Sequence, residues 1–128
     1  MLKEMGLALM EALKDKFIQI EFYEGQFESF DEQVVNPPAA YLDYRRGEEV
    51  LRSDPLSRVE ISLYMMSSSV ARSGSPMLEI LEGVIEAANQ KALHYDGVYL
   101  GRCFYDGFRN YGTYPGLVVW ECLLRVER

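Results

Sequence analysis

The stretch "LSRVEISLYMM", residues 56–66, alternates apolar and polar side chains with the two-residue period of a β-strand. Its odd-numbered positions from Val59 to Met65 are apolar, while its even-numbered positions from Arg58 to Tyr64 are charged, polar or aromatic. A strand with this pattern buries one face and leaves the other accessible. The pattern therefore predicts a sheet that helices cover on one side.

Outward from this strand, similar patterns predict four more strands, at residues 17–23, 39–45, 98–105 and 117–126. Amphipathic helices are predicted at residues 2–16 and from Pro76 onward, because proline suits the first helical position. Gly6 lies inside the first helix, where close packing against a sheet would favour a missing side chain. We expect one domain over residues 1–128, with an α+β fold in the order αβββαββ. Its mixed or antiparallel sheet of about five strands has both helices packed mainly on one face.

Three connecting segments have distinctive compositions. Residues 24–38 are acidic and hold Phe27 and Phe30 isolated among polar residues. These rings either pack onto the core or belong to a segment that orders on contact with a partner. The segment "RRGEE", residues 45–49, is expected to form a turn, and "DGFRNYGTYPG", residues 106–116, is expected to form the long tip of a hairpin.

The balance of charge limits the partners. Thirteen Lys and Arg against twenty Asp and Glu give a net charge of −7, which repels nucleic-acid phosphates, so sequence-specific nucleic-acid binding is not expected. Acidic residues interrupt the apolar positions near the N-terminus, so neither a signal peptide nor a membrane contact is expected, and the cytoplasm is the expected location. Cys103 and Cys122 fall in predicted strands and are interpreted as core thiols.

The sequence contains no motif for catalysis, metal binding or a cofactor. His94 is the single histidine, so a histidine-rich zinc site is excluded, and the serines at 67–69 lack the strand-to-helix setting of a catalytic nucleophile. Asp96 and Asp106 each precede glycine in a predicted turn, where aspartate serves backbone geometry. We expect no enzymatic activity and no cofactor; an enzyme that uses Asp96, Asp106 or Cys103 is the third alternative.

Tyrosine and arginine are concentrated towards the end of the chain. Arg102 and Arg109 are surrounded in the sequence by Tyr95, Tyr99, Tyr105, Tyr111 and Tyr114. This mixture is enriched at protein interfaces and also at stacking platforms for nucleic acid. Packing within the hairpin explains any one of these tyrosines, and contact with another protein is the simplest interpretation of the group.

The order of elements resembles that of a known family. An opening helix, a strand, a long acidic loop, "PPAAYLDYRRG", a further strand, the helix "SPMLEILEGVIEAAN" and a closing hairpin that ends in "GLVVWECLLRVER" follow one another along nearly the whole chain. This arrangement is similar to the tail terminator, or tail completion, proteins of long-tailed bacteriophages and prophages. The resemblance implies an α+β subunit that forms a ring, often hexameric, on the tail tube. The ring stops polymerisation and offers a surface for head attachment.

The resemblance also implies partners and a location. The partners are further copies of this chain, a tail-tube protein and a head-completion or connector protein; the locations are the host cytoplasm during assembly and then the virion tail. A closed ring needs two different complementary patches on each copy. The candidate contact residues are Phe27, Phe30, Tyr41, Asp43, Arg45, Arg46, Arg109, Tyr111 and Tyr114. A small ligand-binding or regulatory domain that uses the open sheet face is the alternative.

Overall fold

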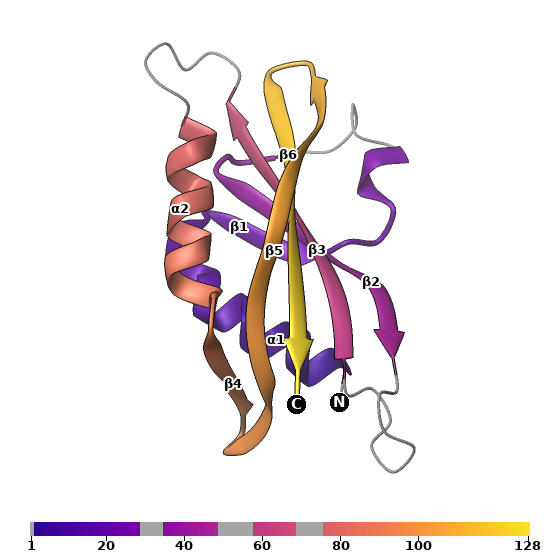
Figure 1. Cartoon of the computed structure of the whole chain (residues 1–128). Coiled ribbons are helices and arrows are strands. Elements are labelled where there is room, and N and C mark those ends of the chain that lie inside the picture. The colour runs from indigo at the N-terminus through magenta and orange to yellow at the C-terminus, as the bar shows by residue number, and fades with distance from the viewer. Residues whose placement is uncertain (1, 29–34, 49–57, 69–75) are drawn as a thin grey trace.

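The alternating stretch around residue 60 lies at the centre of a six-stranded sheet. The computed structural model describes residues 2–28, 35–48, 58–68 and 76–128. In chain order the elements are α1 (Leu2–Leu13), a short 3-10 helix η1 (Lys14–Lys16), β1 (Gln19–Phe22), β2 (Ala39–Glu48), β3 (Arg58–Ser68), α2 (Pro76–Ala88), β4 (Lys91–Tyr95), β5 (Val98–Tyr114) and β6 (Leu117–Glu127). The strands are ordered β1-β2-β3-β6-β5-β4 across the sheet (Figure 1).

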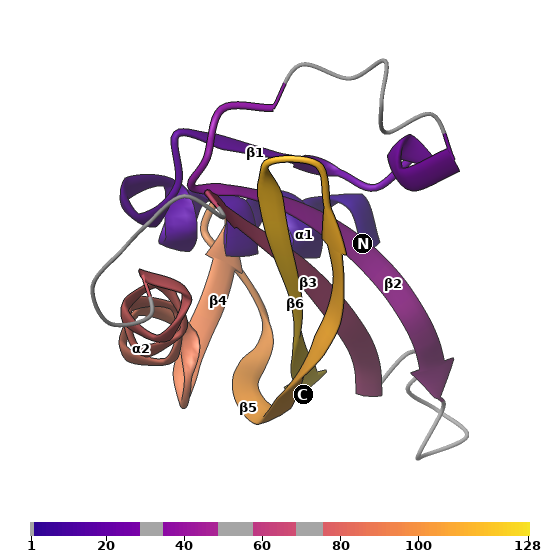
Figure 2. The same ribbon diagram turned by 90° about the horizontal axis from the view of Figure 1, so that it is seen from above.

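The sheet is mixed. β1 pairs with β2 in parallel, and every other neighbouring pair is antiparallel. Seen from above, the strands curve, and α1 lies between the two edge strands β1 and β4, both of which it contacts (Figure 2). The predicted α+β class is confirmed, with six strands in place of about five.

Both helices contribute to one core on one face of the sheet. The apolar stripe of α1, at Met5, Leu9 and Leu13, packs with the odd-numbered positions of β3 and with buried residues of α2 such as Leu81. Gly6 behaves as predicted, since a Cβ atom there would lie 2.5 Å from the ring of Phe22 and would also collide with the hydroxyl of Tyr44. The covered face is therefore the one that the alternation in β3 predicts.

The strand that the sequence analysis missed is β4. The helical stripe ends at Ala88, and Lys91–Tyr95 then pairs with β5. Asp96 and Gly97 connect Tyr95 to Val98 with φ angles of 51° and 80°. Two consecutive positive φ angles are typical of the tight turn of a two-residue hairpin, for which Asp-Gly is a preferred sequence. The turn predicted after the helix is thus the turn of an additional hairpin.

Two connections were predicted wrongly. Most of "RRGEE" is not a turn, because β2 continues through Arg45 and Arg46 to Glu48 and stays paired with β3. The expected long hairpin tip is also strand, since β5 extends to Tyr114 and Pro115-Gly116 alone form the turn to β6. Two β-bulges in β5, near Gly107 and Gly112, absorb the glycines that suggested a loop.

Candidate interaction surface

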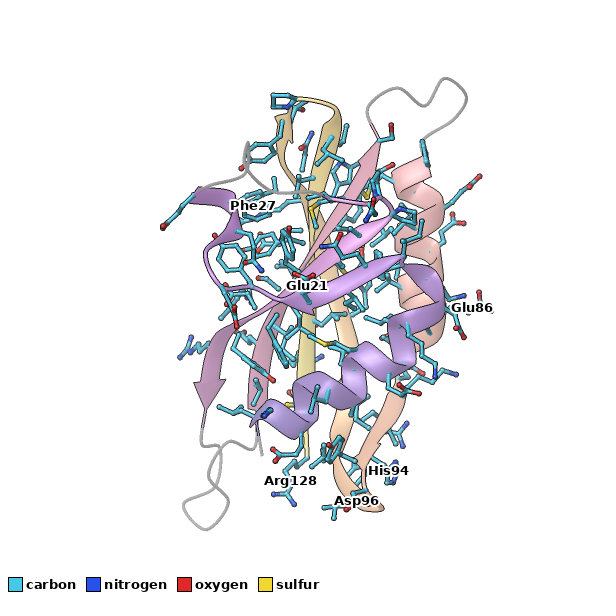
Figure 3. The ribbon with its side chains drawn as sticks, turned by 180° about the vertical axis from the view of Figure 1, so that it is seen from behind. Glu21, Phe27, Glu86, His94, Asp96 and Arg128 are labelled. Atoms are coloured by element: carbon cyan, nitrogen blue, oxygen red, sulfur yellow. The ribbon has the colours of Figure 1, made fainter. Side chains whose placement is uncertain are left out.

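The sheet face opposite the helices carries a group of aromatic rings at one end. We call this group the tyrosine cluster; its members are Tyr23, Phe27, Tyr41, Tyr64, Tyr111 and Tyr114. Phe27 is its centre, with ring centroids 5.2 Å from those of Tyr64 and Tyr111 and 5.7 Å from those of Tyr41 and Tyr114. Figure 3 shows Phe27 among these rings, beside the segment that follows β1. The cluster therefore covers this end of the second face.

Residues 23–28 bring Phe27 into place as a strap across the face. Directly after β1, the amide of Tyr23 donates to the carbonyl of Leu42 at 2.8 Å. The side-chain amide of Gln26 donates to the carbonyl of Phe22 at 2.9 Å, and residues 26–28 form one 3-10 turn. Two interpretations were given for the rings in residues 24–38, and packing onto the fold is the one that describes Phe27. Phe30 lies outside the described residues.

The predicted contact residues of this region differ in exposure. Tyr41 is 1% exposed, so it packs inside the subunit and presents no surface to a neighbour. Tyr111 is 41% exposed and Tyr114 is half-buried, so both still present part of their rings to the outside. An outer rim of tyrosine therefore remains, while Tyr41 and most of Phe27 form the floor beneath it.

A buried carboxylate lies in the middle of the second face. Glu121 of β6 is 1% exposed; it accepts a hydrogen bond of 2.5 Å from the hydroxyl of Ser62 and another from Nε of Arg109. Glu121 is not among the residues predicted from the sequence. One feature of the sequence indicates it: Glu121 is a single acidic residue between apolar neighbours in the last predicted strand. Alternation assigns this position to the face away from the helices.

Burial also raises the pKa values of two groups near Glu121. It raises the pKa of the Asp43 carboxyl, and the charge of Glu121 adds to this rise, whereas a hydrogen bond from the Tyr44 amide opposes it. Burial, together with the charges of Glu121 and Asp43, raises the pKa of Tyr64 to about 12. Tyr64 thus stays neutral and serves as an aromatic and hydrogen-bonding group.

The other end of the second face is charged. A continuous series of ion pairs crosses four strands, with neighbours 2.6 to 3.9 Å apart: Arg45, Glu60, Arg58, Glu127, Arg125 and Asp106. These are cross-strand neighbours on the face away from the core, where opposite charges stabilise a sheet modestly. The face is therefore aromatic at one end and ionic at the other.

A β-bulge changes the direction of the side chains of Arg45 and Arg46 in β2, which were both predicted to be contact residues. Pairing with β3 shifts between Tyr44 and Arg46, and Arg46 is then opposite Glu60. Arg45 also reaches Glu60, at 3.4 Å. Consecutive strand residues normally point to opposite faces, but the extra residue of a bulge changes that alternation. Two successive arginines consequently lie on the same side of the strand, both exposed.

An open cavity of about 460 Å³ lies elsewhere, between the 3-10 helix, the start of β2 and the start of α2. Its lining includes Asp15, Lys16, Pro38, Ser68, Pro76 and Glu79, and Pro37-Pro38 is joined by a cis peptide bond. None of the predicted contact residues lines this hollow.

The residues weighed for catalysis are dispersed. Cys103 and Cys122 are both buried and unpaired, and burial raises the pKa of each thiol to about 12, which makes a thiolate nucleophile unfavourable. Asp106 pairs with Arg125 at 3.1 Å, while Asp96 occupies the β4-β5 turn. Within the described ranges, no three His, Cys, Asp or Glu residues are grouped so that they could hold a metal ion. No described helix has the length and apolar character needed to cross a membrane.

Comparison with solved structures gives an informative match of fold. No family model matches the chain, and no curated protein matches its sequence. The fold resembles that of a chain from the virion of a native gene transfer agent particle. The two chains superpose with a TM-score of 0.54 at 8% sequence identity, over 93% of this chain and 82% of the other. At this identity the match establishes a common fold over nearly the whole domain.

Proposed function

We propose that this chain is a structural subunit of a phage-like particle. In this proposal, copies form a ring on the end of the tail tube, stop its polymerisation and present a surface for head attachment. The fold match to a virion chain over 93% of the domain is the observation that supports the proposal most directly. The order of elements in the sequence, which resembles tail terminator proteins, supports it independently.

The surface of the subunit suits such a role. Ending a polymer requires contact surfaces and no chemical step, and the second face offers both an aromatic rim at Tyr111 and Tyr114 and an ionic region at Arg45. Tyrosine and arginine are among the residues that are enriched at protein interfaces. In this proposal the partners are other copies, a tail-tube protein and a head-side connector, and the subunit passes from the host cytoplasm into the virion.

Native mass spectrometry and electron microscopy test the proposal together. The purified protein, alone over a range of concentrations and mixed with isolated tail tubes, is expected to give a closed oligomer that decorates one end of each tube. Tubes supplied with tube subunits should stop growing once the ring is bound, whereas tubes without it should lengthen. A protein that stays monomeric in both conditions and leaves tube growth unchanged would contradict the proposal.

The alternative of a ligand pocket on the open sheet face has less support. Phe27 fills the space over Tyr41 and Tyr64, so the aromatic end of that face is occupied by the chain itself. The same mass spectra separate the two functions, because a monomer that carries a constant extra mass of a small molecule would favour ligand binding.

A further inference from the structure

The outer face of α2 carries three exposed carboxylates. Glu79, Glu82 and Glu86 are spaced three and four residues apart, which places them on one side of the helix, and all three are exposed. None of them forms an ion pair with any cation of the described residues. Leu78, beside them, is 46% exposed. This face of the helix is therefore acidic, partly apolar and uncovered.

The exposed part of β2 has the opposite character. β1 pairs with β2 only over Ala39–Leu42, so the far side of Asp43–Glu48 pairs with no other strand of the described chain. The bulge places Arg45 and Arg46 together at this edge. Glu60 contacts Arg45 and also Arg58, which in turn contacts Glu127, and the side chain of Arg45 stays 33% exposed.

These two surfaces lie on opposite flanks of the molecule. In Figure 1, α2 and the end of β2 stand at the two sides of the sheet, and Figure 3 shows Glu86 pointing outward on the side away from β2. A head-to-tail contact repeats around a ring when each copy uses two different surfaces. The opposite flanks of one chain thus offer the two halves of such a contact, with complementary charge.

Building on the proposed ring, we propose that the acidic face of α2 on one copy binds the arginine edge of β2 on the next copy. Glu82 and Glu86 of α2 face Arg45 and Arg46 across each boundary, and Leu78 lies at the margin of the contact. Complementary charge at such a boundary sets the register and excludes wrong pairings, because like charges brought together are strongly unfavourable.

Reciprocal charge reversal tests this arrangement. Glu82→Arg with Glu86→Arg makes both surfaces basic, and Arg45→Glu with Arg46→Glu makes both acidic. Each variant alone is expected to need at least about tenfold more protein for half-assembly. Mixed in equal amounts, the two variants are expected to recover assembly, because every boundary then joins an acidic to a basic surface in an alternating ring. Native mass spectrometry should show equal numbers of the two variants in each ring.

Control variants separate the effects of net charge and of folding on assembly from the effect of the proposed contact. Glu11→Arg with Glu24→Arg matches the charge change of the α2 variant, and Lys3→Glu with Lys91→Glu matches that of the β2 variant, at exposed positions outside α2 and β2. These controls should assemble like the parent protein. Circular dichroism verifies that each variant is folded, and Glu82→Gln with Glu86→Gln, which introduces no repulsion, should weaken assembly less.

The outcomes distinguish this inference from the function on which it rests. If the parent protein forms rings but the reversed variants assemble normally, or if folded variants fail to assemble when mixed, this contact is wrong and the ring remains. If the parent protein forms no ring alone or on tail tubes, both the ring and the contact are wrong.

Discussion

Gly6 and Gly83 occupy similar positions inside the two helices, but their surroundings differ. A Cβ at Gly6 would collide with the rigid ring of Phe22, whereas a Cβ at Gly83 would meet the flexible side chain of Lys16, with Cδ at 3.3 Å. Alanine favours a helix over glycine by about 1 kcal/mol, while forced overpacking costs about 1 to 3 kcal/mol. We expect Gly6→Ala to lower the free energy of unfolding and Gly83→Ala to raise it slightly, as measured by urea denaturation. Equal effects of the two substitutions would contradict this packing.

Asp43 should make stability depend on pH. Its pKa is raised above the ordinary 3.8, so the folded state binds the proton more tightly than the unfolded state. The stabilising contribution is present below the ordinary pKa and is lost as the pH rises through the raised value. Asp43→Asn keeps a hydrogen-bond acceptor for the Tyr44 amide, and we expect it to raise the melting temperature at neutral pH but not in acid. Glu24→Gln, at an exposed position outside both proposed contact surfaces, is the control for net charge, and it should change the melting temperature at neutral pH less than Asp43→Asn does.

At the scale of residues, the sequence predicted packing better than polar contacts. Gly6 and both cysteines are where the patterns indicated. Tyr41 was predicted to be a contact residue, but the strap covers its part of the second face and the ring is buried. Glu121 could not be found in this way, because its partners Ser62 and Arg109 come from other strands and depend on the register of the sheet.

The pair formed by Arg109 of β5 and Glu121 of β6 should respond asymmetrically to substitution. The Arg109 side chain is 66% exposed, whereas that of Glu121 is 1% exposed. Arg109→Leu leaves a buried carboxylate without a cation and should cost about 3 kcal/mol of unfolding free energy. Glu121→Leu leaves an arginine that water can solvate, and we expect a smaller loss. Chemical denaturation of the two single variants and the double variant measures this, and equal losses would contradict the account.

The strap should depend on the ring of Phe27. Phe27→Ala removes ring contacts with five tyrosines, and because the ring is half-buried we expect a loss of about 2 kcal/mol together with a reduced near-ultraviolet circular dichroism signal. Phe108→Ala is a matched control, since Phe108 is 46% exposed and stacks on Trp120. A larger loss at Phe108 than at Phe27 would show that the strap is not a stable part of the fold.

At the scale of elements, regular periodicity predicted both helices and five strands, and errors arose where glycine and short length obscured the pattern. "KALHY" is too short to show alternation between a helix and an Asp-Gly turn, and β4 was therefore missed. β5 continues through glycines because bulges accommodate them, although isolated glycines in a strand suggest its end as often as a bulge. The bulge in β2 has no signal in "RRGEE", because its position depends on pairing with β3.

At the scale of the whole molecule, the reactivity of the two buried cysteines can show whether the core unfolds cooperatively. Cys103 and Cys122 lie in the single core on the helical side of the sheet, and burial raises the pKa of both thiols to about 12. We expect both to resist a thiol reagent in the native protein and to react together, at a rate set by global unfolding. Stopped-flow labelling in increasing urea tests this. Rapid modification of either cysteine without denaturant would show that the core opens locally.

The bulge of β2 also bears on the tendency of the chain to aggregate. An unpaired strand edge invites another chain to add to the sheet, and such growth has no natural stopping point. Two neighbouring arginines on a kinked edge oppose that addition, since a foreign strand would have to desolvate both charges and match an irregular backbone. The edge of β2 therefore disfavours fibril growth.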